Sequence, residues 1–416
     1  MTEKRLLFLY ARARLCYNRR VKYVIYGGTF NPPHPQHIAI ARHALDCGYD
    51  KVVLLPSGVP PHKSCFVGAE HRLQMLRIAA RGERDMLIDE YELTAGGGVN
   101  YTSDVLPVML KKYPGAHYLI GGDSLIDLHK WHEPEKIIKM CPFLVCRRAG
   151  RDEEFEKALD FWRKKGAEIS VMDYYPEDIS STLARWRAEL GDYRDLDEQV
   201  AEYIKKHDLY DDYADIIDRL SLMVKPARLA HCKRTCECAV MLNIKLRLGL
   251  DNEKVFLAGL LHDCGKGSSV FDLNKAKKPL PPDADEEDRQ SVARPEPFEL
   301  ALIPADAVGK PVEHQFVGAV LAERVFGVRD KEILDGVRYH CTGKAEMSVM
   351  EKLIFCADVL EEGRDYPGVE RLRSLISADF EEGFRACLKA SYDNVRKKGG
   401  EMYPLTAQAY EYYFGK

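Results

Sequence analysis

The stretch Tyr26-Gly27-Gly28-Thr29-Phe30-Asn31-Pro32-Pro33-His34-Pro35-Gln36-His37 directly follows a short apolar run at residues 23–26. Two adjacent glycines let the backbone approach a ligand closely, and a helix that begins near His37 aims free backbone N–H groups at an anion. Paired imidazoles at such a helix start can stabilise charge on a phosphate. The stretch predicts a strand, a phosphate-binding loop and a helix, with Gly27, Gly28, Thr29, His34 and His37 as candidate site residues.

The same rhythm of strand and helix continues through the first half of the chain. Short apolar runs alternate with amphipathic stretches such as residues 71–80 and 154–165. This alternation predicts a mainly parallel sheet covered on both faces, with ligands bound beyond the carboxyl ends of its strands. We predict a Rossmann-like, doubly wound α/β domain over residues 21–212. Its strands are expected at residues 23–26, 52–55, 86–88, 118–120, 143–146 and 169–172.

The pattern changes from about residue 215, where strand signals stop and apolar residues recur at the spacing of helices. We predict an all-α domain over residues 213–416, with the boundary in the acidic stretch at residues 211–215. Residues 277–297 are rich in proline and charge, which predicts an exposed loop within an insertion at about 268–311. The helices are expected at residues 227–248, 255–262, 313–326, 331–340 and 349–361.

Composition and charge exclude several classes of protein. The chain has 416 residues, with 61 Lys and Arg against 65 Asp and Glu, a net charge of −4, and 46% apolar residues. These values are typical of globular domains and argue against a disordered chain, a fibrous protein or a nucleic-acid-binding protein. No apolar run approaches the ~18 residues that span a bilayer. We therefore expect a cytoplasmic protein with neither nucleic acid nor membrane as a partner.

The N-terminus and the cysteines show no pattern of a secreted protein. Residues 1–20 lack the long apolar region of a signal peptide, so we expect an N-terminal extension. Twelve cysteines are spread over the whole chain, unlike a disulfide framework. Cys232, Cys236 and Cys238 are close enough in sequence to suggest a metal site, but no partner pair follows them. We expect reduced cysteines that pack as small helix residues.

A second candidate phosphate-binding segment lies near the end of the first domain. Residues 179–185 read Ile-Ser-Ser-Thr-Leu-Ala-Arg, so three hydroxyls stand at an expected helix start and an arginine follows one turn later. Hydroxyl and N–H groups at a helix start suit a triphosphate, and Arg185 could clamp it. A helix cap would explain one serine, but explains the whole group less readily.

The first half resembles the bacterial nicotinate-mononucleotide adenylyltransferases over about residues 21–210. The resemblance implies a Rossmann-like fold and transfer of the adenylyl group of ATP to nicotinate mononucleotide, with Mg²⁺, to give nicotinate adenine dinucleotide and pyrophosphate. It implies no covalent intermediate with the enzyme, so catalysis would be positioning plus electrostatics. The shared stretches, in order, are GGTFNPPHxxH, LPSGVPPHK, EHRLQML, NYTSDVL, LIGGDSLIDLHKW and ISSTLAR.

The resemblance also implies roles for single residues. Thr102 would help to bind the nicotinate carboxylate, Trp131 would stack on the pyridine ring, and Asp123 would lie near the nucleotide. A buried core position is the alternative for Trp131, and a helix cap is compatible with Asp123. The catalytic candidates are His34, His37 and Arg185; the other nucleotide contacts are Gly27, Gly28 and Thr29 on the ATP phosphates and Ser181 and Thr182 on the triphosphate and adenosine side.

One departure from the family pattern bears on activity. The family has His-x-Gly-His, whereas Gln36 replaces the glycine here. A glutamine side chain could crowd the site or change the preferred backbone angles. An alternative is therefore that this half is slow, acts on another substrate, or binds nucleotide as a weak or non-catalytic sensor. Ala184 also replaces a larger aliphatic residue, which matters less.

Histidines and aspartates of the second half form a candidate metal site. Every histidine after residue 210 lies on or at the end of a predicted helix, and one is followed directly by an aspartate. Neutral imidazole and carboxylate are ligands of hard or borderline divalent metals, and an aspartate beside a histidine could bridge two ions. A single histidine on a helix is usually structural, so the argument depends on all of them together. The candidate ligands are His231, His262, Asp263, His314, His340 and Asp358.

The second half resembles the bacterial HD-domain hydrolases that split diadenosine tetraphosphate symmetrically, over about residues 221–375. The resemblance rests on LAGLLHDCGK, EHQFVGAVLAE, YHCTG, EKLIFCADVLE and RDYPGVE. It implies an all-α HD fold with two divalent or iron-type metal ions, which activate a water and polarise a phosphoryl oxygen, and two ADP as products. Asp263 and Lys266 would be catalytic, although Lys266 could equally stabilise a helix end. Weaker candidates for nucleotide contact are Thr342, Gly343 and Arg364.

The whole chain is therefore predicted to be a bifunctional enzyme with ATP, nicotinate mononucleotide and diadenosine tetraphosphate as its ligands. A homo-oligomer stays open. So does a second half that hydrolyses another nucleotide, including nicotinate adenine dinucleotide. The insertion at 268–311 is longer than the second resemblance leads us to expect. Two complete candidate sites argue against a protein that serves mainly as a scaffold.

Overall fold

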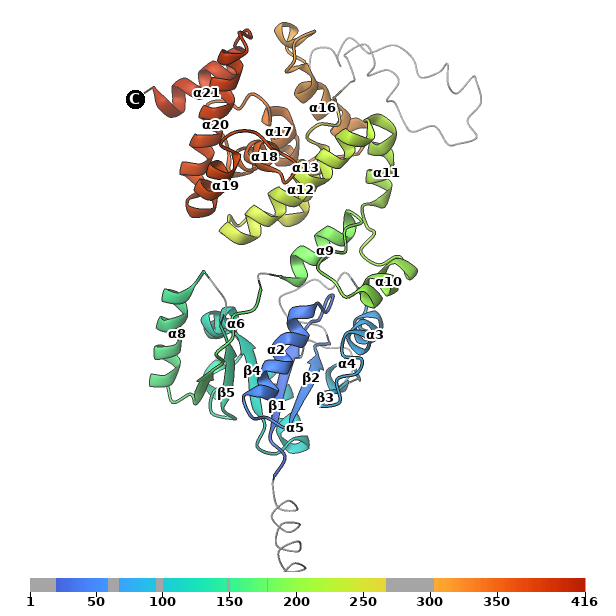
Figure 1. The fold of residues 1–416 in the computed structure, drawn as a ribbon, viewed down its shortest axis with the longest axis vertical. Helices are drawn as coiled ribbons and strands as arrows, with labels where there is room; N and C mark the ends of the chain where they lie inside the picture. Colours follow the sequence, from blue (N-terminus) through green and yellow to red (C-terminus); the bar gives the residue numbers. More distant parts are fainter. Residues whose placement is uncertain are drawn as a thin grey trace, which may run out of the picture. The chain divides into compact units, whose positions relative to one another are not determined.

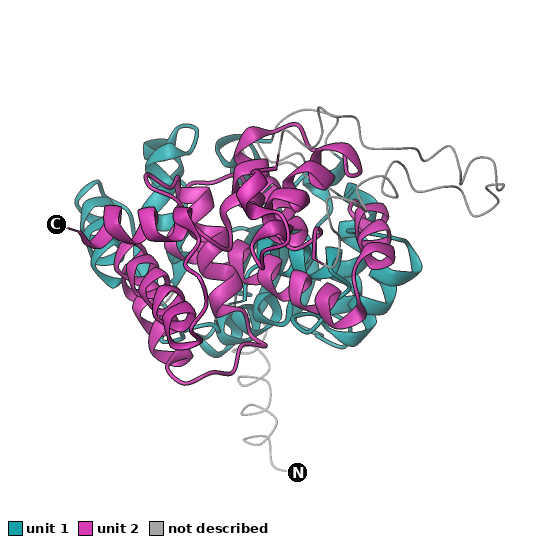
Figure 2. Ribbon diagram, turned by 90° about the horizontal axis from the view of Figure 1, so that it is seen from above, with its two compact units in different colours: residues 1–210 teal, residues 211–416 magenta. Residues whose placement is uncertain are grey.

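The chain divides into two units, residues 1–210 and 211–416, in the computed structural model (Figures 1 and 2). The expected N-terminal extension, apart from its last residue, and residues 268–302 of the expected insertion lie outside the described residues. No helix in the described part is both long enough and apolar enough to cross a membrane. The structure describes residues 20–58, 67–94, 100–147, 150–177, 179–266 and 303–415.

A six-stranded parallel sheet organises unit 1, in the order β3-β2-β1-β4-β5-β6. From β1 the chain adds β2 and β3 on one side and then crosses over to add β4, β5 and β6 on the other side. Such folds bind ligands where the strand order changes direction, here between β1 and β4. Each strand coincides with an apolar run of the sequence, and the predicted α/β fold is confirmed. The strands are β1 Tyr23–Gly28, β2 Lys51–Pro56, β3 Met86–Ile88, β4 His117–Gly121, β5 Phe143–Cys146 and β6 Ile169–Val171.

The strands supply two hydrophobic clusters, one on each face of the sheet. Because side chains alternate along a strand, Ile25 joins one cluster, whereas Val24 and Tyr26 join the other. Helices cover both faces, as a parallel sheet requires (Figure 1). The helices of unit 1 are α2 Pro35–Asp46, α3 Ala69–Ala79, α4 Tyr91–Thr94, α5 Thr102–Lys112, α6 Gly122–Ile126, α7 Pro134–Ile137, α8 Asp152–Lys164, α9 Ser181–Glu189 and α10 Glu198–Lys206, with the 3₁₀ turn η1 Asp127–Lys130.

The described part of unit 2 is helical, and the predicted all-α domain is confirmed. Local signals set several boundaries. Pro226 takes the first position of α12, where no N–H is needed, and Ser348 caps α18 by accepting the N–H of Glu351 at 3.2 Å. The helices are α11 Ala214–Met223, α12 Pro226–Leu246, α13 Asn252–Leu261, α16 Glu313–Arg324, α17 Lys331–Tyr339, α18 Val349–Leu360, α19 Val369–Ala378, α20 Phe380–Lys397 and α21 Pro404–Phe414, with the 3₁₀ turn η3 Ala305–Ala307.

Close packing of α12 against α13 begins to assemble the candidate metal site. A Cβ on Gly259 would lie 2.7 Å from the Cα of Cys236, so a glycine is needed for this approach. Cys236 is buried there, and its thiol donates to the carbonyl of Phe256 at 3.3 Å. The clustered cysteines of α12 therefore pack as small buried residues. The same approach brings His231 on α12 beside His262, which directly follows α13.

Candidate functional site

A cleft of about 430 Å³ opens at the carboxyl ends of β1 and β4 in unit 1. This volume suits a nucleotide or another small ligand. Two segments that are far apart in the sequence meet there, namely the start of α2 and the start of α9. Of the residues predicted from sequence, the cleft is lined by Gly27, Gly28, Thr29, His34, His37, Asp123, Trp131, Ser181, Thr182 and Arg185.

Buried groups hold the loop after β1 in place. A Cβ on Gly27 would lie 2.6 Å from the hydroxyl oxygen of Tyr118, so this packing requires a glycine. Arg72 is almost completely buried, and its guanidinium donates to the carbonyls of Thr29 and Ser57, each at 2.8 Å. Sequence analysis missed Arg72, although it lies within one of the stretches that carry the first resemblance.

The two histidines of the glycine-rich stretch stand at the start of α2 and contact each other. The backbone N–H of His34 donates to Nδ1 of His37 at 3.1 Å, and the ring centroids are 3.8 Å apart. Since Nδ1 of His37 accepts, a neutral His37 ring carries its proton on Nε2 and can donate it to a ligand oxygen. Both rings line the cleft at the positive end of a helix, which favours an anion.

The start of α9 is tied to the same loop. Ser181 donates its hydroxyl hydrogen to the carbonyl of Pro32 at 2.9 Å. Arg185 donates to the carbonyl of Asn31 at 2.5 Å and to the hydroxyl of Thr182 at 3.2 Å. The structure thus brings the two predicted phosphate-binding segments into one cleft, with hydroxyls and a guanidinium beside the glycine-rich loop.

The three residues predicted for the nucleotide and pyridine contacts differ in their placement. Asp123 follows β4 and pairs with Arg151 at 3.0 Å. Trp131 is half-buried in the wall of the cleft. Thr102 is not among the lining residues, but its side chain hydrogen-bonds to Tyr118, which does line the cleft. Contact between Thr102 and the nicotinate carboxylate stays a prediction.

Gln36, which stands where the family has glycine, takes the second position of α2. It does not adopt the left-handed conformation that favours glycine, so the backbone tolerates a glutamine here. Its side chain is 8% exposed, and its Oε1 accepts the hydroxyl hydrogen of Tyr174 at 2.8 Å. The sequence-based concern about backbone angles therefore does not apply at this position.

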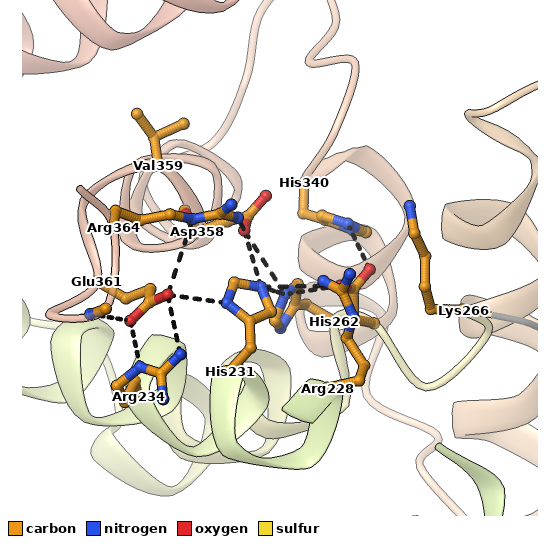
Figure 3. A network of polar contacts seen from close by, with 12 residues as sticks. Arg228, His231, Arg234, His262, Lys266, His340, Asp358, Val359, Glu361 and Arg364 are labelled. Atoms are coloured by element: carbon orange, nitrogen blue, oxygen red, sulfur yellow. Dashed lines mark hydrogen bonds and ion pairs between the residues drawn. The ribbon is translucent and has the colours of Figure 1, made fainter. Parts of the chain in front are cut away.

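Six side chains converge in unit 2, and Figure 3 labels four of them, His231, His262, His340 and Asp358. His231 Nε2 lies 3.1 Å from His262 Nε2 and 3.0 Å from Oδ1 of Asp358. On the other side, His314 Nε2 lies 3.3 Å from His340 Nε2. The structure therefore brings together all the predicted metal ligands, namely His231, His262, Asp263, His314, His340 and Asp358.

Asp263 lies between two sets of histidines. Its Oδ1 is 3.3 Å from Nε2 of His314 and 3.5 Å from Nε2 of His340. Its Oδ2 is 3.6 Å from Nε2 of His262 and 3.7 Å from Nε2 of His231. A carboxylate that turns one oxygen toward each set can bind one ion or bridge two.

Hydrogen bonds on the outer side of the rings fix which nitrogen faces the centre. Nδ1 of His262 and of His340 lies 2.7 Å from the carbonyl three residues earlier, and Nδ1 of His314 lies 2.8 Å from its equivalent. Because a carbonyl only accepts, Nδ1 carries the proton and Nε2 presents its lone pair to the centre. This is the tautomer that a metal ligand needs.

The environment also sets suitable protonation states. Burial lowers the pKa of His262 to about 4 and the pKa of His314 to about 3. Burial alone would raise the pKa of Asp263 and of Asp358, but the neighbouring imidazoles outweigh it and hold both pKa values below the ordinary range. Burial alone would lower the pKa of His340 as well, but its hydrogen bond to Asp263 raises it. Neutral imidazoles, as at His262 and His314, and ionised carboxylates are the forms that bind cations, so these donors fit a divalent metal, whose binding would displace a proton from His340.

Glu361 supports one of these histidines and was missed by the sequence analysis. It is 2% exposed, and its carboxylate accepts from Nδ1 of His231 at 3.1 Å and from Nε of Arg234 at 2.6 Å (Figure 3). The backbone N–H of Gly363 donates to it at 2.5 Å. The only signal in the sequence was its position three residues after Asp358, at the end of a predicted helix.

Cationic side chains flank the centre (Figure 3). Arg228 pairs with Asp263 at 2.5 Å, and Arg364 pairs with Asp358. The ammonium nitrogen of Lys266 lies 3.3 Å from Nδ1 of His314. Both arginines keep about a third of their side-chain surface exposed, so an anion that arrives from solvent would meet them.

Thr342 and Gly343 form a turn just after His340. Thr342 is 1% exposed, and its hydroxyl accepts from Nε2 of Gln315 at 3.0 Å and donates to the carbonyl of Gly343 at 2.9 Å. Gly343 has a φ of +64°, a conformation that favours glycine. These bonds assign both residues a structural role, and nucleotide contact by either of them stays a prediction.

We expect alanine at Gly265 to disturb the metal centre. A Cβ there would overlap the backbone of His314 and Gly318, so α16 would have to shift. Such overpacking costs about 1–3 kcal/mol, and the shift would move His314 away from the centre. Gly265→Ala should therefore unfold at a lower denaturant concentration and retain less metal. Gly336→Ala is the control, because its Cβ meets only ordinary contacts. Wild-type metal content in Gly265→Ala contradicts the expectation.

Two family models match the chain. Residues 25–187 match the cytidylyltransferase-like family, and residues 228–363 match the HD domain. The first match covers the sheet and the cleft of unit 1. The second covers all six residues of the metal centre.

Curated relatives are similar to one or both units. A probable nicotinate-nucleotide adenylyltransferase of Gloeobacter violaceus is 37% identical over 196 residues, which are 45% of this chain and 95% of the relative. Proteins of Mycoplasma pneumoniae and Mycoplasma genitalium, each named probable nicotinate-nucleotide adenylyltransferase/Ap4A hydrolase, are 25% identical. Their alignments span 81% and 88% of this chain and 88% and 97% of the relatives.

Proposed function

The chain belongs to the nicotinate-nucleotide adenylyltransferase family, and we propose on this premise that it is a bifunctional enzyme. Unit 1 transfers the adenylyl group of ATP to nicotinate mononucleotide, and the products are nicotinate adenine dinucleotide and pyrophosphate. The observation that carries this assignment is the meeting of the α2 and α9 starts in one cleft, where His34, His37 and Arg185 surround a single space.

The groups in the cleft suit transfer by positioning. A phosphate oxygen of nicotinate mononucleotide attacks the α-phosphorus of ATP, and pyrophosphate leaves with the electron pair of the broken bond. Negative charge spreads over the phosphate oxygens during this step, and His37 Nε2–H together with the Arg185 guanidinium would stabilise it. Trp131 would stack on the pyridine ring. A bound Mg²⁺ would neutralise part of the phosphate charge.

Unit 2, which carries the HD domain, hydrolyses diadenosine tetraphosphate symmetrically into two ADP in this proposal. The six converging side chains would hold two ions, and Asp263 would be one of their ligands. The bound metal would lower the pKa of a water and polarise a phosphoryl oxygen. A donor set of four imidazoles and two carboxylates suits a borderline divalent metal, and we propose iron.

The cations around this centre would orient the substrate. Arg228 and Arg364 pair with ligand carboxylates and are partly exposed, so each can turn to a phosphate oxygen when a polyphosphate arrives. Lys266 would provide a third positive charge beside the second set of histidines. These charges recognise phosphate groups and leave the nucleoside unspecified.

Pyrophosphate release from ATP, nicotinate mononucleotide and Mg²⁺ tests the first activity. The full-length chain with Asp263→Ala is used, so that unit 2 is silent. Formation of nicotinate adenine dinucleotide in step with pyrophosphate supports the proposal. Binding of ATP without turnover supports the nucleotide sensor instead.

A nucleotide panel tests the second activity. The iron-loaded full-length chain is incubated with diadenosine tetraphosphate, nicotinate adenine dinucleotide and nucleoside triphosphates, and the products are separated. ADP as the sole product of diadenosine tetraphosphate supports symmetrical cleavage. Equal amounts of AMP and ATP would mean asymmetrical cleavage. Faster cleavage of another nucleotide would make that nucleotide the substrate of unit 2 in place of diadenosine tetraphosphate.

We expect Glu361→Gln to weaken metal binding by about 10- to 100-fold, which is typical when the residue that orients a ligand histidine is changed. Glutamine keeps the shape but removes the charge that holds the Nδ1 proton of His231. Competition with a chelator measures the affinity. Glu362→Gln, on the neighbouring exposed carboxylate, is the control. Equal metal retention in both variants would rule out a role of Glu361 in holding the ligand.

A further inference from the structure

Gln36 lies beside an apolar part of the unit 1 cleft. Ile40 follows it by one turn on the same side of α2, and both line the cleft with Cys146 from the end of β5. Cys146 is itself in contact with Tyr174, since its thiol donates to the Tyr174 carbonyl at 3.9 Å. Gln36, Ile40, Cys146 and Tyr174 therefore form one group. A nucleoside triphosphate needs an apolar surface for its purine base next to the groups that hold its phosphates.

Tyr174 fixes the direction of the Gln36 amide. Its hydroxyl donates to Oε1 at 2.8 Å, and its ring stacks on His43 with centroids 3.8 Å apart and planes 25° apart. Because Oε1 is occupied, the amide turns its Nε2 hydrogens elsewhere, and the structure gives them no hydrogen bond to any residue of the described ranges. The side chain is more than nine-tenths buried. Gln36 lines the cleft, and Nε2 is not one of the fully enclosed side-chain atoms that lack a partner, so this nitrogen keeps an accessible surface and can donate to a ligand there.

We propose that Gln36 recognises the base of ATP, with its Nε2–H donating to a ring nitrogen of the adenine and Tyr174 holding the amide in that direction. The inference rests on the proposed function of unit 1. It assigns a purpose to the residue that departs from the family pattern: the side chain that replaces glycine supplies a contact to the nucleoside. Tyr174 is a positioning residue, because it acts only through Gln36.

Two ligands separate a contact to the nucleoside from a contact to the phosphates. The affinity of the full-length chain for an α,β-methylene analogue of ATP and for inorganic tripolyphosphate is measured by calorimetry, with Asp263→Ala in every variant. Gln36→Met keeps the size of the side chain and removes the amide. This variant should bind the ATP analogue about three- to tenfold more weakly, which is the contribution of one hydrogen bond, and should bind tripolyphosphate with unchanged affinity.

The tyrosines offer a matched pair. Tyr174→Phe removes the hydrogen bond that holds the Gln36 amide and should lower the affinity for the ATP analogue. The loss should be smaller than in Gln36→Met, because the amide can still reach the base. Tyr175→Phe, on the neighbouring exposed tyrosine, should change nothing. Thermal unfolding of each variant checks that the fold is kept.

Wild-type affinity for the ATP analogue in Gln36→Met would overturn the inference, and so would an equal weakening for tripolyphosphate. A wild-type chain that binds the analogue but transfers nothing would remove the proposed activity of unit 1. The contact would still stand in that case if Gln36→Met binds the analogue more weakly.

Discussion

Asp263→Asn is expected to reduce hydrolysis of diadenosine tetraphosphate by about 10³-fold or more and to leave adenylyl transfer unchanged. Asparagine keeps the shape of the side chain but loses the charge and one of the two oxygens that face the histidine sets. A bound metal supplies several kcal/mol of transition-state stabilisation, and each 1.36 kcal/mol is a factor of ten in rate. Release of ADP and the metal content of the purified protein are the two measurements.

A surface aspartate of the same unit provides the control for this variant. Asp335 lies on α17, where it faces Lys331 at 4.0 Å, and Asp335→Asn should change neither metal content nor hydrolysis. Full metal content with full hydrolysis in Asp263→Asn would show that the reaction does not depend on this carboxylate. Loss of adenylyl transfer in Asp263→Asn would show instead that the two activities are linked.

The order of secondary structure could be read from the sequence because it depends on local patterns. The apolar runs of unit 1 are short and regularly separated, and each became a strand within about two residues. The helices of unit 2 show clear periodicity and local start signals, such as Pro226 at the first position of α12. Most of the insertion expected at 268–311 lies outside the described residues.

The metal ligands were predictable for a different reason. Histidines such as His231 and His340 are sparse in unit 2, and their residue type limits the chemistry they can perform. Glu361 and Arg72 were not predictable, because glutamate and arginine are common surface residues. Their roles come from contacts with distant segments, such as the 130 residues that separate Glu361 from His231.

The effect of Gln36 also depends on a distant segment. Sequence comparison with the family pattern shows only that a glycine is missing. The orientation of the side chain is set by Tyr174, which is 138 residues away in the sequence. Without the Tyr174 hydroxyl, a glutamine at position 36 would be free to point into the ligand space. The effect of glutamine in place of glycine at position 36 therefore depends on which residue stands at position 174.

His37→Asn is expected to lower kcat of adenylyl transfer by about 10²- to 10³-fold, the usual loss when one donor to a developing charge is removed. The asparagine oxygen can replace Nδ1 as the acceptor of the His34 N–H, so the start of α2 should keep its conformation. The donor on Nε2 is lost. Initial rates of nicotinate adenine dinucleotide formation at saturating ATP measure the effect.

The split between kcat and KM decides what His37 contributes. A donor that acts mainly in the transition state lowers kcat and changes the KM for ATP by less than about threefold. His129→Ala, on an exposed histidine of the same unit, should behave like wild type. A large rise in KM with unchanged kcat would make His37 a binding residue only, and unchanged kinetics in His37→Asn would remove it from the reaction. Ser181 and Arg185 of α9 donate to the carbonyls of Pro32 and Asn31, in the loop that leads to His37. If His37 is catalytic, these hydrogen bonds between the loop and α9 also align the reacting groups.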